Sequence, residues 1–437
     1  MAESKTRRSL EGIRVIDLTW LLAGPGGTRI LASLGAQVIR VECREPRAVD
    51  FLRYTPPFPR KESSPQQQDA GILAGSPANG LNRSGLFNNI NPGKFAITLN
   101  LNNPKGRDLL KRLVASAHVL CENFSPERMD QWGVGCAELR KVNPALIYVQ
   151  TTGMGKAGVY RDYAGYGPTA QALSGLTAMS GLPEPRDPAG WGYSYLDHSP
   201  GYYSSTMVIA AIIRQRKTGQ GCYIDLSQTE CGIMLSGTAA LSYQLSGRPT
   251  ARHGNRMPFA PWAPHGAYPC RAQTEDGDEW VAIAVQNDAQ WTALVAEMGS
   301  PAWAADTRYA SAAGRKANED ELDGKLAAWT ATQERYDLMA RLQARAVPAG
   351  VVQKSIDRFT RDEQLKARGF FVKLPHSEIG EWPVDGFPAR MSASPAFVGG
   401  LPNRAAPTLG EDNERIYREV LGINDAELQA LKAEGAV

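Results

Sequence analysis

The chain has 437 residues, of which 43% are hydrophobic and 21% are charged, and these are ordinary values for a soluble globular protein of two or three folding units. Its 48 basic and 45 acidic side chains leave a net charge of +3, too small to select nucleic acid or acidic lipid as a partner. The longest apolar run, Met207 to Ile213, is too short to span a membrane, and the charged first residues do not form a signal peptide. We therefore expect a cytoplasmic enzyme or binding protein.

Cysteine and histidine residues give no indication of a metal site. The six cysteines are scattered and form no C-x-x-C pair, and the five histidines never recur at the spacing of ligands on one helix. We expect reduced thiols, and we assign no residues to a metal and no permanently bound cofactor.

The chain opens with a strand over 13–18, a turn over 23–27, a short helix over 30–34 and a second strand over 38–41. A short helical connection between two strands predicts a right-handed parallel unit. The turn reads Gly-Pro-Gly-Gly, which is not the G-x-G-x-x-G of dinucleotide-binding proteins, and Pro25 has no N–H for a phosphate. We therefore do not predict nicotinamide or flavin binding.

After a Pro- and Gln-rich segment over 44–86, expected to be a long loop or lid, strands and helices alternate. We predict strands over 95–101, 118–122, 146–150 and 223–227, and helices over 104–116, 126–132, 207–216 and 229–244. This alternation predicts an α/β fold with a doubly wound parallel sheet. We expect a large domain from 1–230 and 356–437, a linker over 231–259 and a smaller domain over 260–355.

Nearly the whole chain carries motifs whose order and spacing together resemble the class III coenzyme A transferase family. These motifs are 10–18 (LEGIRVIDL), 23–25 (AGP), 34–42 (LGAQVIRVE), 91–94 (NPGK), 122–126 (ENFSP), 143–148 (NPALIY), 216–221 (RKTGQG), 347–350 (VPAG) and 405–410 (AAPTLG). The resemblance implies a Rossmann-like large domain, an inserted α+β domain and two interlocked chains. It also implies coenzyme A as co-substrate and, as in some members, a second, paralogous subunit.

The resemblance also implies the chemistry. A carboxylate attacks an acyl-CoA, such as succinyl-CoA, to form an acyl-aspartyl anhydride, and returning CoA converts this anhydride into an aspartyl-CoA thioester. The acceptor, an organic acid that we expect to be dicarboxylic or aryl-substituted, then takes the CoA. Alignment on the motif at 216–221 places Asp197 at the nucleophile. The alternative for Asp197 is a helix cap, since Asp is a favoured capping residue.

Two other functions stay open. Racemase relatives use a His and an Asp as bases, and the position of that His is held here by Tyr166, a poor base at neutral pH. A non-catalytic binding or scaffold subunit of a heteromeric transferase is the second alternative. The glycine-rich loop that shields the intermediate in some members is not evident in 253–262, and Leu22 stands where some members have Gln.

For coenzyme A binding, the family motif assigns Asn123 and Phe124, an amide and a ring beside the adenine. Lys94 is a candidate partner for a phosphate, and Arg44 follows the second strand near the place where a basic residue often contacts CoA. An aromatic cluster is a candidate pocket for an aryl group, or else packs in a core or dimer interface; it comprises Trp191, Tyr193, Tyr195, Tyr202 and Tyr203.

Overall fold

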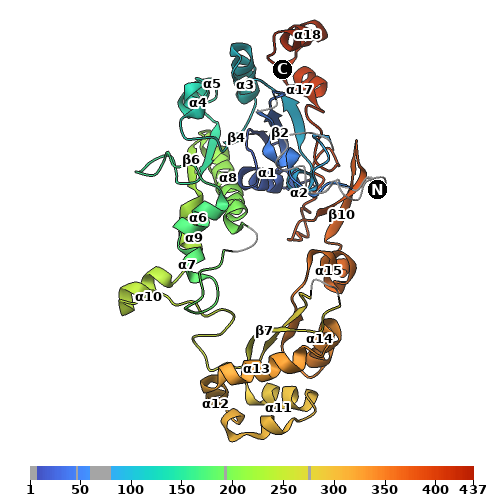
Figure 1. Cartoon of the computed structure of the whole chain (residues 1–437). Helices are drawn as coiled ribbons and strands as arrows, with labels where there is room; N and C mark the ends of the chain where they lie inside the picture. Colours follow the sequence, from blue (N-terminus) through green and yellow to red (C-terminus); the bar gives the residue numbers. More distant parts are fainter. Residues whose placement is uncertain (1–6, 46–47, 60–79, 191–193, 274–276) are drawn as a thin grey trace. The chain divides into compact units, whose positions relative to one another are not determined.

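The computed structural model describes residues 7–45, 48–59, 80–190, 194–273 and 277–437. The chain forms two compact units. The first contains residues 1–176, 191–240 and 364–437, and the second contains 177–190 and 241–363. Both ends of the chain, blue and red in Figure 1, therefore belong to the first unit. None of the helices in the described part of the chain is long and apolar enough to cross a membrane.

A six-stranded sheet forms the centre of the first unit, and every neighbouring pair of strands is parallel. In spatial order the strands are β3 (Phe95–Thr98), β2 (Gln37–Glu42), β1 (Arg14–Asp17), β4 (Val119–Glu122), β5 (Ile147–Thr152) and β6 (Tyr223–Ser227). This sheet confirms the predicted α/β class. The order 3-2-1-4-5-6 is that of a doubly wound nucleotide-binding sheet, which reverses direction between β1 and β4.

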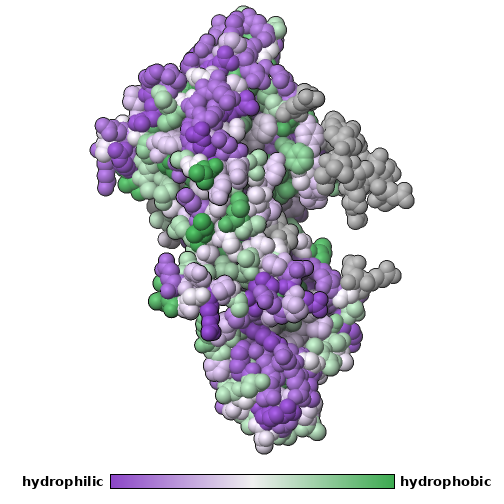
Figure 2. All heavy atoms as spheres, turned by 60° about the vertical axis from the view of Figure 1, so that its left-hand side comes forward, coloured by the Kyte–Doolittle hydropathy of each residue, from purple (hydrophilic) through white to green (hydrophobic). Residues whose placement is uncertain are grey.

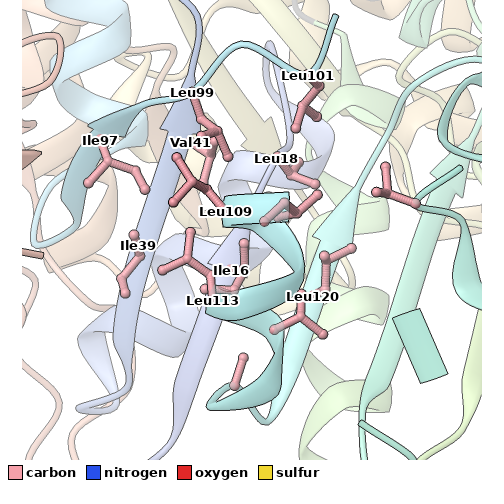
Figure 3. Packing of buried hydrophobic residues seen from close by; sticks show 14 of the residues in the cluster. Ile16, Leu18, Ile39, Val41, Ile97, Leu99, Leu101, Leu109, Leu113 and Leu120 are labelled. Atoms are coloured by element: carbon pink, nitrogen blue, oxygen red, sulfur yellow. The ribbon is translucent and has the colours of Figure 1, made fainter. Parts of the chain in front are cut away.

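Hydrophobic residues on both faces of the sheet make two cores, because side chains alternate along each strand. On one face Ile16 and Leu120 pack with Leu109 and Leu113 of α3 (Pro104–Ala115), as Figure 3 shows. The helices α17 (Asn413–Leu421) and α18 (Asp425–Ala433) join this core. On the other face Val15 packs with α1 (Ala23–Ser33) and α8 (Ser199–Thr218). The sheet is therefore covered by helices on both sides.

The other elements of the first unit are shorter. They are α2 (Gly85–Ile90), α4 (Arg128–Gln131), α5 (Cys136–Val142), α6 (Gly167–Leu173), α9 (Gln228–Leu235), the antiparallel hairpin β10 (Phe371–His376) and β11 (Gly380–Asp385), and the 3-10 turns η2 (Phe51–Tyr54) and η3 (Tyr195–Asp197). Three helices cross the borders between the units: α7 (Leu176–Met179), α10 (Ala239–Ser246) and α16 (Glu363–Arg368).

The second unit is built on a three-stranded antiparallel sheet and has a core of its own. Its strands are β7 (His265–Pro269), β8 (Trp280–Ala284) and β9 (Ala349–Val351). Its helices are α11 (Asp288–Glu297), α12 (Ala312–Ala317), α13 (Glu319–Thr330), α14 (Arg335–Ala344) and α15 (Ser355–Thr360), with the 3-10 turns η4 (Ala302–Ala305) and η5 (Thr307–Tyr309). Buried Arg335 pairs with Glu279 and Asp357, which ties α14 to β8 and α15.

Three local predictions differ from the structure. The turn expected over 23–27 is the first part of α1. The helix expected over 229–244 is two helices, because α9 ends at Leu235 and α10 begins at Ala239. Gly237 lies between them with a positive φ of 58°, which breaks the helical conformation. The segment 44–86 contains η2 and α2, while its residues 60–79 lie outside the described part.

The glycines near the start of α1 allow α1 and α8 to approach closely. A Cβ atom on Gly201 of α8 would lie 2.8 Å from the backbone nitrogen of Gly27 and 2.9 Å from the oxygen of Ala23. Neither backbone atom can move without shifting α1. Gly26, one residue away, faces open space, since a Cβ there meets no atom within 4 Å. The Gly-Pro-Gly-Gly motif is therefore used for helix packing.

We predict that Gly201→Ala lowers the free energy of unfolding by roughly 1–2 kcal/mol, because overpacking outweighs the better helix propensity of alanine. Gly26→Ala is the matched control, and we expect it to be neutral or to stabilise by up to about 1 kcal/mol. Urea denaturation of both variants measures the difference. Equal stability of the two variants would contradict the close approach of α1 and α8.

Candidate active site

A cavity of about 410 Å³ opens at the carboxyl edge of the parallel sheet, within the first unit. Its wall contains residues that follow β1 (Leu21, Ala23), β4 (Asn123–Pro126) and β5 (Gly153), and it is completed by the segment 161–166, Thr169, Asp197 and Gln228. This place is the switch point between β1 and β4, where doubly wound sheets bind their ligands. The sheet topology therefore predicts a ligand-binding site at the place where the cavity lies.

Asp197 lies in the cavity wall as the last residue of η3 and is half-buried. Its neighbour Leu196 is fully buried and anchors the turn. The backbone N–H of Gly167, the first residue of α6, donates a hydrogen bond of 3.0 Å to Oδ1 of Asp197. The N-cap of α8 is His198, and that cap makes no side-chain hydrogen bond. The Asp197 carboxylate is therefore held at the first residue of α6.

Gly167 is required at its position because no side chain fits there. A Cβ on this residue would lie 2.5 Å from Cγ of Asp197 and 2.1 Å from Oγ of Ser194. The first turn of α6 therefore presents only backbone to the carboxylate. The sequence interpretation missed Gly167, although the pair Gly167-Pro168 fits the first helical turn, where Pro is favoured.

Asn123 connects the loop after β4 to the turn after β1. Its Oδ1 accepts a hydrogen bond of 2.7 Å from the N–H of Trp20, and its Nδ2 donates one of 2.9 Å to the oxygen of the same residue. The side-chain amide thus continues the pairing of β1 and β4 beyond the strands. One Nδ2 hydrogen and further acceptor capacity on Oδ1 are left for a ligand.

Phe124 also lines the cavity and has aromatic neighbours on two sides. Its ring centroid lies 5.9 Å from that of Trp20 and 5.5 Å from that of Trp132, both in edge-to-face geometry. The guanidinium of Arg128 lies 5.5 Å from the Trp132 ring centroid. These contacts hold the Phe124 ring in a defined orientation at the cavity.

Glu122, the last residue of β4, lies directly before this loop and is fully buried. Its carboxylate accepts hydrogen bonds from the N–H of Phe124 (2.8 Å) and the hydroxyl of Tyr148 (3.3 Å). Burial raises the pKa of Glu122 to about 8, since these donors only partly offset the loss of water. Glu122 is therefore largely protonated at neutral pH.

Six charged side chains form a buried ionic network beneath the turn between β1 and α1. The three acids are Asp17, Glu42 and Asp50, and the three bases are Arg40, Arg53 and Lys94. The opposite charges balance in number, which makes burial of all six tolerable. The guanidinium groups of Arg40 and Arg53 also lie over the ring of Phe87, so that the network packs against a hydrophobic cluster.

The network fixes the backbone that lines the cavity. Asp50 accepts a hydrogen bond of 3.1 Å from the N–H of Leu21, whose φ of 61° is rare for a residue with a Cβ. The guanidinium of Arg40 donates to the backbone oxygen of Thr19 at 2.8 Å, and the carboxylate of Asp17 accepts from the backbone N–H of Thr19 at 3.0 Å. The turn that presents Leu21 to the cavity is therefore held at both ends by charge-assisted bonds.

Lys94, a candidate for a phosphate contact, belongs to this network. Its Nζ donates to Asp17 (2.9 Å), Thr28 (2.7 Å), Asn91 (2.8 Å) and the oxygen of Pro25 (3.1 Å), and the side chain is fully buried. Burial lowers the pKa of Lys94 to about 8, while Asp17 opposes this shift. This placement gives the predicted phosphate contact no support and assigns the amine to the fold.

The other candidate residues are dispersed. Arg44 is exposed after β2, at the same edge of the sheet, but it does not line the cavity. Of the aromatic cluster, Trp191 and Tyr193 lie outside the described residues, Tyr195 and Tyr202 are exposed, and Tyr203 is half-buried. The structure thus brings together Asp197, Asn123 and Phe124 in one cavity. Among the described residues, no three His, Cys, Asp or Glu side chains converge as they would in a metal site.

The fold and the cavity define a doubly wound α/β protein with a half-buried carboxylate at its switch point. The family model for CoA-transferase family III matches residues 10–413, and the chain therefore belongs to this family. It is an enzyme that transfers CoA between acyl-CoA and organic acids. This family membership confirms the resemblance found in the sequence motifs.

Individual relatives agree with this assignment. The chain is 31% identical to a succinyl-CoA–D-citramalate CoA-transferase of Chloroflexus aurantiacus over the full length of both chains. It is 33% identical to a succinate–glutarate CoA-transferase of Agrobacterium fabrum, covering 94% of this chain and 95% of the relative. A crystal structure of a CAIB/BAIF family protein from Brucella suis matches with a TM-score of 0.81 and 32% identity, over 95% of this chain and all of the other.

The raised pKa of Glu122 predicts a specific dependence of stability on pH. The native state keeps this proton up to about pH 8, whereas an unfolded glutamate loses it near 4.5. The contribution of Glu122 to the free energy of unfolding therefore falls by on the order of a few kcal/mol as the pH rises from about 4.5 to about 8. We expect Glu122→Gln, which cannot ionise, to remove that decline. Urea denaturation at pH 5 and pH 8 measures it.

The exposed residue Glu419 on α17 supplies the control. Glu419→Gln removes an exposed carboxylate outside the Glu122 site and should keep the pH dependence of the parent. If Glu122→Gln follows the parent at both pH values as well, Glu122 is ionised in the native protein and its assignment as a buried acid is wrong.

Proposed function

We propose that this CoA-transferase acts through Asp197, which attacks the acyl-CoA donor, forms an acyl-aspartyl anhydride and then carries CoA as a thioester. The observation that carries this proposal is the half-buried carboxylate in the wall of the switch-point cavity, with one oxygen bound to the N–H of Gly167. The bound Oδ1 fixes the carboxylate, so that Oδ2 is the attacking atom. Fixing a weak nucleophile in this way supplies proximity and orientation.

The donor that fits best is the CoA thioester of a dicarboxylic acid, such as succinyl-CoA, and the acceptor that fits best is a dicarboxylic acid. The relatives named above act, by their names, on succinyl-CoA or succinate and on citramalate or glutarate. The cavity wall contains one basic side chain, Arg161, which is exposed and contacts Asp162 at 3.4 Å. A guanidinium in the wall of the cavity that also contains Asp197 suits the second carboxylate of such an acid. The same wall contains the aromatic side chains of Tyr163 and Tyr166, which suit an aryl-substituted acid as the second candidate acceptor.

Coenzyme A would lie along the loop after β4. Phe124 offers a fixed ring beside the adenine, and Asn123 retains hydrogen-bonding capacity beyond its two bonds to Trp20. Arg44, exposed at the same edge of the sheet, is placed to meet a phosphate of an extended ligand. A cavity lined by Asp197 together with Asn123 and Phe124 supports a catalytic chain over a scaffold subunit.

We also propose that the active form is a dimer of interlocked chains or a heteromer with a paralogous chain. Large hydrophobic side chains are exposed on α8 and α9, among them Tyr202, Ile213 and Met234 with exposed fractions of 61%, 54% and 68%. Figure 2 shows hydrophobic residues in green among hydrophilic ones on the visible face. Two relatives are named as alpha and beta subunits of a succinyl-CoA–L-malate CoA-transferase. Sedimentation at high dilution that shows a compact single chain would contradict this proposal.

The substitution Asp197→Asn tests the nucleophile. Asparagine keeps the shape and can still accept from Gly167, but it lacks the attacking charge, so we expect CoA exchange to fall by more than about a thousandfold while CoA binding changes less than about threefold. Asp108→Asn, an exposed position on α3, is the control and should retain the activity of the parent. Turnover is measured with succinyl-CoA and a set of dicarboxylic acids, in the oligomer that the parent forms.

The result that would end the proposal is simple to recognise. If Asp197→Asn retains turnover within about twofold of the parent, Asp197 does not form the covalent intermediate. The Asp197→Glu variant adds a second comparison, because it keeps the charge but shifts the carboxylate by about 1 Å, a displacement that can cost around a hundredfold.

A further inference from the structure

Ser194 carries a buried hydroxyl that no bond in the structure explains. Its Oγ is shielded from solvent and has no hydrogen-bond partner among the described residues. A buried hydroxyl without a partner normally costs free energy, so such a group calls for a functional explanation. The backbone carbonyl oxygen of Ser194, in contrast, accepts a hydrogen bond of 3.2 Å from the N–H of Asp197, which fixes the two residues in one turn.

The unpaired hydroxyl lies near the carboxylate oxygen of Asp197 that Gly167 binds. Measured from the position that a Cβ would take on Gly167, Oγ of Ser194 lies 2.1 Å away and Oδ1 of Asp197 lies 2.6 Å away. Both groups thus converge on the space left by the missing side chain. The N–H of Gly167 already donates to Oδ1 in this space.

We propose that the Gly167 N–H and the Ser194 hydroxyl form an oxyanion hole for the carbonyl oxygen of acylated Asp197. This inference rests on the proposed covalent function of Asp197. When the CoA thiolate attacks Cγ of the anhydride, a C–S bond forms and an electron pair moves onto Oδ1. The tetrahedral oxyanion then collapses, the C–O bond to the acyl group breaks, and the donor acid leaves as a carboxylate with that electron pair.

In this proposal the Gly167 N–H, which already binds Oδ1, and the Ser194 hydroxyl beside it stabilise the charge that develops on Oδ1 in this step. They do not assist the first step in the same way, because Asp197 loses negative charge when it attacks the acyl-CoA and the oxyanion then forms on the substrate. Removal of the Ser194 donor therefore slows the second half-reaction selectively. This selectivity separates a catalytic donor from a residue that only supports the fold.

The test compares the parent with Ser194→Ala, Ser194→Thr and the exposed control Ser392→Ala. Each is mixed with succinyl-CoA, quenched over time and weighed by mass spectrometry for acyl-aspartyl and CoA-aspartyl protein. For Ser194→Ala we expect anhydride formation within about twofold of the parent and CoA-thioester formation slowed on the order of tenfold to a hundredfold. Ser194→Thr keeps the hydroxyl and should restore the second rate to within about threefold.

Three results would overturn the oxyanion hole. Ser194→Ala could match the parent in both half-reactions, it could slow both equally, or Ser194→Thr could be as slow as Ser194→Ala while its thermal unfolding matches the parent. Failure of the proposed function looks different: the parent itself then forms no adduct on Asp197, and both proposals are rejected together.

Discussion

The position of the nucleophile depends on the close contact between α1 and α8 at Gly27 and Gly201. Since no side chain separates the two helices there, α8 begins against the first turn of α1, at the carboxyl edge of the sheet. Asp197 is separated from α8 by His198 alone and is therefore held over the switch point. A larger residue at either glycine would move the carboxylate away from the loops that line the cavity with it.

The buried ionic network provides the second constraint, and it acts on the part of the cavity wall that follows β1. Three acids and three bases beneath the sheet edge fix the turn over 19–23, including the unusual backbone of Leu21. Asn123 then joins this turn to the loop that carries Phe124. Charge pairing and a side-chain amide thus hold the cavity in shape before any ligand binds, which lowers the entropic cost of binding.

Much of the fold could be predicted from the sequence, because hydrophobic patterning and motif order determine the strands and the parallel sheet. Asp197, Asn123 and Phe124 could be predicted to share a site because they occupy motif positions. Lys94 was harder: a lysine at a strand start looks solvated in the sequence, and only tertiary pairing with Asp17 shows that it is buried. Gly167 could not be found because it lies 30 residues before Asp197 and only the fold brings the two together. Ser194 lies in the same turn as Asp197 but belongs to no motif.

The most direct measurement of the central claim is a peptide map of the enzyme after brief reaction with succinyl-CoA. Hydroxylamine or borohydride trapping should modify one carboxylate, and fragmentation should place the modification on Asp197 in the peptide that leads into α8. The account predicts this adduct in the parent and its absence in Asp197→Asn. A modification at another carboxylate, or turnover with no covalent adduct at all, would contradict the account.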